Sequence, residues 1–81
     1  MSKESVGKLV RHYLEGQHPE GITIAVLDDA IRRQDDYWYV PVQPDRQPPK
    51  MYAYYEALAE VEGELEENDS LNVLLVPTVP E

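Results

Sequence analysis

The chain has 81 residues, a formal net charge of −9 and no cysteine. A chain of this length forms one domain, residues 1–81, that buries only about 60 to 65% of the surface of its unfolded form; the lack of cysteine excludes disulfides and thiolate metal sites, and no apolar run approaches the roughly 20 residues of a membrane span. We therefore expect a soluble, cytoplasmic domain of marginal stability, which a second subunit would stabilise.

The charges are distributed unevenly along the chain. All seven Lys and Arg lie in residues 1–50, together with eight Asp and Glu, whereas residues 51–81 carry eight acids and no base. Because phosphate affinity comes from counterions released by cations, an acidic half disfavours a chain that lies along nucleic acid. It permits a basic protein partner, or mimicry of a nucleic acid. The plainer interpretation, which we favour, is a solvated acidic surface.

The first predicted element is a helix that runs from Ser2 to near Gly16. Ser2 is a suitable N-cap, and apolar residues recur after it at helical spacing: Val6, Leu9, Val10, Tyr13 and Leu14. The following segment, QHPEG, ends the helix, because Pro19 disfavours helical geometry at the residue before it.

Residues 22–33 are the most ambiguous segment. A strand is supported by alternating β-branched residues: Ile22, Ile24 and Val26. A helix would be supported by a different set on one side: Leu27, Ala30 and Ile31. We predict a strand. Ile31 has the wrong parity to share a face with Ile24, so we also predict a β-bulge at Asp28 and Asp29 that restores the parity.

Residues 34–36 form the predicted hairpin turn, and residues 37–43 return as the second strand. Strand parity places Tyr37 and Tyr39 on one face, opposite the apolar set Trp38, Val40 and Val42. Pro41 cannot donate a ladder hydrogen bond, so we predict that this strand forms an outer edge of the sheet.

Residues 49–67 form the second predicted helix. Its predicted buried stripe is Met51, Tyr54, Tyr55, Leu58, Val61 and Leu65, and the opposite side is acidic: Glu56, Glu60, Glu64 and Glu67. The turn NDS closes the helix. Residues 71–76 form the third strand, which Pro77 stops.

These elements predict an α+β fold with two layers: α-β-β-α-β, with a three-stranded antiparallel sheet and both helices on one face. With the second strand at an edge, the strand order is 2-1-3. The face away from the helices then carries Tyr37, Tyr39, Leu74 and Val76, and an exposed apolar surface of this kind marks a partner. Its cover is a second copy of the chain, a different protein, or the C-terminal segment VPTVPE.

The sequence contains no known catalytic motif, and we expect no enzymatic activity, no cofactor and no metal. His12 and His18 are poorly spaced for one metal ion. The adjacent acids at positions 28–29 and 35–36 carry oxygens suited to a hard cation, but turn and bulge roles are the preferred interpretation.

Two candidate binding surfaces remain. In the aromatic hairpin, Tyr37 and Tyr39 face outward. Four basic residues are close to them in sequence: Arg32, Arg33, Arg46 and Lys50. Exposed tyrosines flanked by Arg resemble single-strand nucleic-acid binding sites. Nearby aspartates offset the charge, so we favour a cross-strand aromatic cluster with Arg32 stacked on a ring. The acidic strip of the second helix, Glu56, Glu60 and Glu64, suits a basic partner.

We therefore predict a small acidic protein-interaction module, an adaptor or regulator without catalytic activity, that forms a homodimer. The alternative is a nucleic-acid-associated or nucleic-acid-mimicking regulator that uses the same surfaces. The predicted partner-binding residues are Tyr37, Tyr39, Arg32, Glu56, Glu60, Glu64, Leu74 and Val76.

Overall fold

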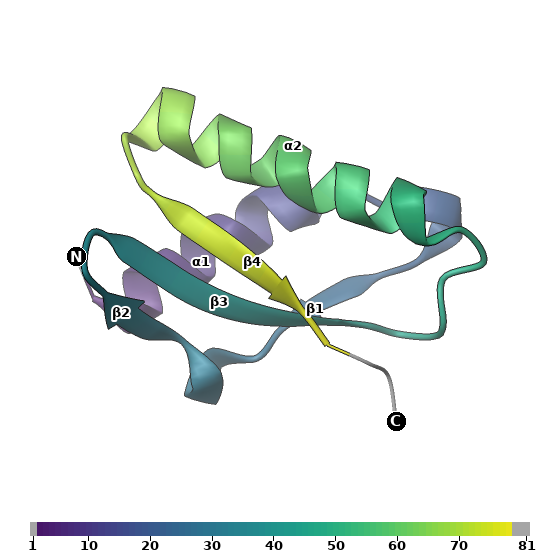
Figure 1. Cartoon of the computed structure of the whole chain (residues 1–81), viewed down its shortest axis with the longest axis horizontal. Coiled ribbons are helices and arrows are strands. Elements are labelled where there is room, and N and C mark those ends of the chain that lie inside the picture. Colours follow the sequence, from purple (N-terminus) through teal and green to yellow (C-terminus); the bar gives the residue numbers. More distant parts are fainter. Residues whose placement is uncertain (1, 79–81) are drawn as a thin grey trace.

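In the computed structural model, which describes residues 2–78 apart from the Glu20 side chain, two helices pack on one face of a sheet (Figure 1). The elements in chain order are α1 (Lys3–Leu14), the 3₁₀ turn η1 (Pro19–Gly21), β1 (Ile24–Val26), the 3₁₀ turn η2 (Asp28–Ala30), β2 (Arg32–Gln34), β3 (Tyr37–Pro44), α2 (Met51–Asp69) and β4 (Val73–Pro77). The α+β class and the α-β-β-α-β order are confirmed, with the first predicted strand divided into β1 and β2.

Both helices begin and end close to the predicted positions. The Ser2 hydroxyl caps α1 by accepting the Ser5 N–H at 3.2 Å. α2 ends at Ser70, which adopts the left-handed conformation with φ 51°. The Tyr13 hydroxyl donates to a carboxylate oxygen of Asp69 at 2.8 Å, so the last turns of the two helices are joined.

An insertion is present where the β-bulge was predicted, at Asp28 and Asp29 in the arm formed by β1, η2 and β2, but it is larger than predicted. Val26 pairs with Val42 and Arg32 pairs with Tyr39, so five residues of the arm, 27–31, lie opposite two residues of β3, 40 and 41. The three extra residues lie around η2 where one bulged residue was predicted. An insertion of one residue or of three residues moves the following side chains to the opposite face of the sheet. Ile31 is accordingly buried in the core, at 1% exposure.

The strand order differs from the prediction. β3 lies in the centre: β1 and β2 pair antiparallel with its two ends on one edge, and β4 pairs parallel with it on the other edge (Figure 1). The predicted order 2-1-3, wholly antiparallel, is therefore wrong in the position and direction of the last strand.

Pro41 explains the error. It lies opposite the interruption between β1 and β2, where its carbonyl accepts the Leu27 N–H at 3.0 Å and no partner requires a donor. A proline therefore fits in the central strand because the neighbouring strand is broken beside it.

The core lies between the helices and one face of the sheet. Trp38, Val40 and Val42 of β3 are buried there, as their parity predicted, together with the helix residues Val6, Val10, Leu14, Tyr54, Leu58, Val61 and Leu65. Gly7 allows α1 to approach η2, because an added Cβ would lie 2.8 Å from the Asp28 Oδ1 atom.

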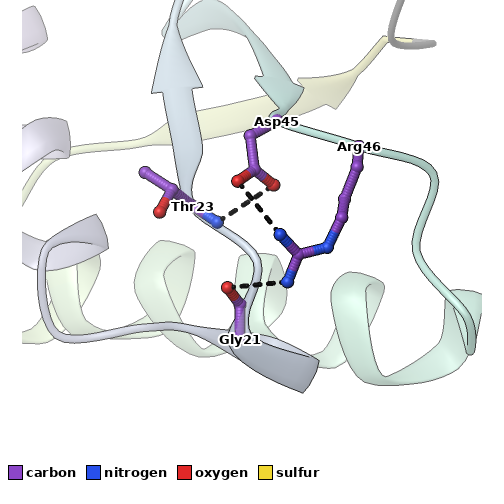
Figure 2. A network of polar contacts seen from close by, with 4 residues as sticks. All are labelled: Gly21, Thr23, Asp45 and Arg46. Carbon is purple, nitrogen blue, oxygen red and sulfur yellow. Dashed lines mark hydrogen bonds and ion pairs between the residues drawn. The ribbon is translucent and has the colours of Figure 1, made fainter.

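The loop between β3 and α2 is held against the start of β1 by polar contacts (Figure 2). Arg46 Nη2 donates to the Gly21 carbonyl at 3.1 Å, and Arg46 Nη1 lies 3.5 Å from Asp45 Oδ2. The Thr23 N–H donates to Asp45 Oδ1 at 3.4 Å. This network fixes the C-terminal end of β3, which is the end away from the hairpin turn.

Candidate interaction surfaces

The face of the sheet opposite the helices carries a continuous apolar surface, which we name the open sheet face. Its side chains are Tyr37, Tyr39 and Pro41 of β3, Leu74 and Val76 of β4, and Arg32 of β2. Tyr37, Leu74 and Val76 are exposed at 43%, 37% and 39%, whereas Tyr39 is half-buried. The structure thus brings together five of the predicted residues: Tyr37, Tyr39, Arg32, Leu74 and Val76.

The registers of the three strands place these side chains in rows across the sheet. Arg32, Tyr39 and Leu74 form one row, and Pro41 lies beside Val76 in the next. The Arg32 guanidinium carbon lies 5.8 Å from the centre of the Tyr39 ring. Arg32 therefore stacks on an aromatic ring, as the preferred interpretation of the hairpin predicted.

The basic residues that are close in sequence to the hairpin are dispersed in the structure. Arg33 lies on the helix side of the sheet, with its guanidinium carbon 5.7 Å from the centre of the Trp38 ring. Arg46 is engaged in the network at the other end of β3. Of the three arginines, Arg32 alone lies beside the tyrosines of the open sheet face, which weakens the nucleic-acid alternative.

The C-terminal segment that could cover Leu74 and Val76 is only partly described. Pro77 is the last residue of β4, and the Thr78 N–H donates to the Val42 carbonyl at 2.9 Å. Residues 79–81, the remainder of that segment, lie outside the described residues.

The predicted acidic strip lies on α2. Glu56 and Glu60 are exposed and Glu64 is half-buried. Within residues 2–78, the ion pairs join Arg11 to Asp28 and Arg46 to Asp45, and neither involves α2. The strip lies on α2, not on the open sheet face, and no ion pair among residues 2–78 balances its charge.

The first turns of α2 differ from the prediction. Met51 and Tyr55 were assigned to the buried stripe, but they are exposed at 38% and 48%, and Tyr52 is exposed at 66%. The helix begins beyond the end of the sheet (Figure 1), and of residues 51–55 only Tyr54 is buried. Helical periodicity predicts which side of the helix faces the sheet, but it does not predict where along the helix the sheet ends.

Sequence reasoning missed the role of Glu62. Its carboxylate Oε2 accepts the backbone N–H of Leu75 at 2.7 Å. Because this N–H points away from β3, the bond shows that alternate residues of β4 direct their backbone groups toward the outer edge of the sheet. Beside this edge lies a hollow of about 340 Å³ between α2 and β4.

Two tyrosine hydroxyls are perturbed. Burial raises the pKa of Tyr54 to about 12, and its hydroxyl has no hydrogen-bond partner among residues 2–78. The hydrogen bond to Asp69 raises the pKa of Tyr13. Tyr54 belongs to the core under α2, so these shifts describe packing and helix contact, not a shared reactive centre.

The histidines have local contacts. The His12 ring packs edge-on against Tyr13, and His18 Nε2 lies 2.9 Å from the Glu15 carbonyl oxygen. Among residues 2–78, no three His, Cys, Asp or Glu side chains gather as metal ligands would. Within the same residues, neither helix has the length and apolar composition needed to cross a membrane.

Comparison with protein-family models, with curated proteins and with solved structures finds no match to this chain.

Proposed function

We propose that the chain is a non-catalytic protein-interaction module that forms a homodimer through its open sheet face. One observation carries this proposal: the face opposite the helix layer exposes Tyr37, Leu74 and Val76 in one contiguous apolar area. Monomeric soluble proteins rarely expose such a surface unless it is used for binding. A domain of 81 residues also gains much from burying a second face.

The charges around the face favour a second copy as its occupant. Arg32 lies on the face, and Asp35 and Asp36 lie in the turn at the same end of the hairpin. In a two-fold dimer the same patch is used by both subunits, so the arginine of one copy can pair with a turn aspartate of the other. The lack of cysteine fits a cytoplasmic location, which we include in the proposal.

A pair of charge insertions tests the proposal. Leu74→Glu places a carboxylate in the centre of the buried contact, and we expect sedimentation velocity to show a monomer. Tyr52→Glu is the matched control, because Tyr52 is an exposed apolar residue on α2, away from the face. It should leave the dimer intact. Loss of the dimer in both variants, or in neither, would contradict the assignment of the open sheet face.

A further inference from the structure

The outer edge of β4 (Figure 1) is a second surface, which adjoins the open sheet face at Tyr37 and Leu74. The residues that flank β4 show which of its backbone groups face β3: the Trp38 N–H donates to the Asn72 carbonyl, and the Thr78 N–H donates to the Val42 carbonyl. In the parallel register, Leu74 and Val76 continue this alternation. The backbone groups of Val73 and Leu75 therefore face outward. Pro77, at the next outward position, has no N–H.

The groups on this edge are incompletely paired. The Leu75 N–H is held by Glu62, whereas the Val73 N–H and the carbonyls of Val73 and Leu75 have no partner among residues 2–78. An unpaired row of this kind is a template for an added strand. It presents one unpaired donor, the Val73 N–H, and two acceptors, and the Leu75 N–H becomes a second donor when Glu62 releases it.

A hollow of about 340 Å³ lies alongside the edge and leaves room for an added chain. Its wall on α2 is formed by Ala59, Glu62, Gly63 and Glu66, and its wall on the sheet includes Val73 and Leu74. No heavy atom lies within 4 Å of an added Cβ at Gly63. The small residues at 59 and 63 keep the space open, and the two glutamates make it acidic.

This acidity decides between occupants. Pairing β4 with β4 of a second copy would bring two acidic helices together, and no Lys or Arg occurs in residues 51–81 to offset them. A basic chain would instead be attracted. The Glu62 carboxylate could then exchange the Leu75 N–H for a cationic side chain, while the added strand supplies a carbonyl to that N–H.

We propose that the β4 edge binds an extended basic segment of a partner protein as an additional strand of the sheet. Residues directly opposite each other on neighbouring strands share a face. Val73 and Leu75 face the helix layer and Leu74 faces the open side. The segment therefore alternates: Lys or Arg opposite Val73 and Leu75, where they meet Glu62 and Glu66, and an apolar residue opposite Leu74.

Titration with a synthetic peptide of alternating Lys and Val, followed by amide NMR, tests the proposal. We expect saturable shifts centred on the Val73 and Leu75 amides and weaker binding at high salt. A peptide of the same composition, with all Lys before all Val, should bind at least about tenfold more weakly, because it cannot place cations on one face only.

Matched charge reversals locate the site on α2. Glu66→Lys should weaken binding of the alternating peptide at least about tenfold, whereas Glu67→Lys, the same change at an exposed position of α2 outside the hollow, should change the affinity less than about threefold. No saturable shift, equal binding of the two peptides, or equal effects of the two substitutions would overturn the proposal. Because Tyr37 and Leu74 belong both to the open sheet face and to the lining of the hollow, the titration is made at a protein concentration at which light scattering gives the mass of a monomer, so that its outcome is separate from that of the dimer test.

Discussion

Removal of the Tyr54 hydroxyl tests the packing under α2. Tyr54 is 1% exposed, and its hydroxyl has no partner among residues 2–78. An unpaired buried polar group costs about 1 to 3 kcal/mol. We therefore expect Tyr54→Phe to raise the free energy of unfolding at pH 7 by about 1 kcal/mol, since the ring is kept and only the desolvated hydroxyl is lost.

The difference in the free energy of unfolding between Tyr54→Phe and the wild type should increase above pH 10. The pKa of Tyr54 is raised from 10.0 to about 12, so below pH 10 the hydroxyl is neutral in both states and contributes no pH dependence. Above pH 10 the unfolded state ionises first, and the free energy of unfolding of the wild type falls until the folded pKa is passed. At about 1.4 kcal/mol per unit of pKa, the loss reaches roughly 2 to 3 kcal/mol. Tyr54→Phe should not show this component.

Urea unfolding between pH 7 and pH 11.5 measures both effects. Tyr55→Phe is the matched control, because the neighbouring Tyr55 is 48% exposed, and its stability should differ from the wild type by less than about 0.5 kcal/mol. A loss of more than about 1 kcal/mol in Tyr54→Phe at pH 7 would show that the hydroxyl has a hydrogen-bond partner. If the difference in the free energy of unfolding between Tyr54→Phe and the wild type stayed constant above pH 10, the burial of the Tyr54 hydroxyl would be refuted.

Two further substitutions test α2. Leu58 is 4% exposed in the core, so Leu58→Ala should lower the free energy of unfolding by about 2 to 4 kcal/mol, and an unchanged urea midpoint would show that the stripe is not buried. Gly63 lies within the helix with open space around its Cα, so Gly63→Ala should raise the melting temperature through a gain of about 0.5 to 1 kcal/mol. A lower melting temperature would indicate that α2 is packed against a neighbour at this position.

Much of the fold could be predicted from local patterns. The cap at Ser2, the alternation in β3 and the odd parity of Ile31 each follow from the geometry of one element, and each is confirmed. The strand order could not be obtained in this way. It depends on Pro41 lying opposite a break in the neighbouring strand, and that coincidence of two segments is visible only when they are paired.

The candidate surfaces were predictable to a similar extent. Parity was enough to place Tyr37, Tyr39, Leu74 and Val76 on the open sheet face. The order 2-1-3 also leaves the last strand at an edge of the sheet, but it pairs that strand antiparallel with a different neighbour, so the backbone groups that point outward could not be predicted. The contact between Glu62 and Leu75 joins a helix to a strand through the backbone, for which a side-chain pattern gives no signal.

The mass of the wild-type protein in solution tests most directly whether the open sheet face is a docking surface for a second copy. Static light scattering across a range of micromolar concentrations should give about twice the chain mass of 9.3 kDa, decreasing toward that mass on dilution. A value of 9.3 kDa at every concentration would contradict the proposed homodimer.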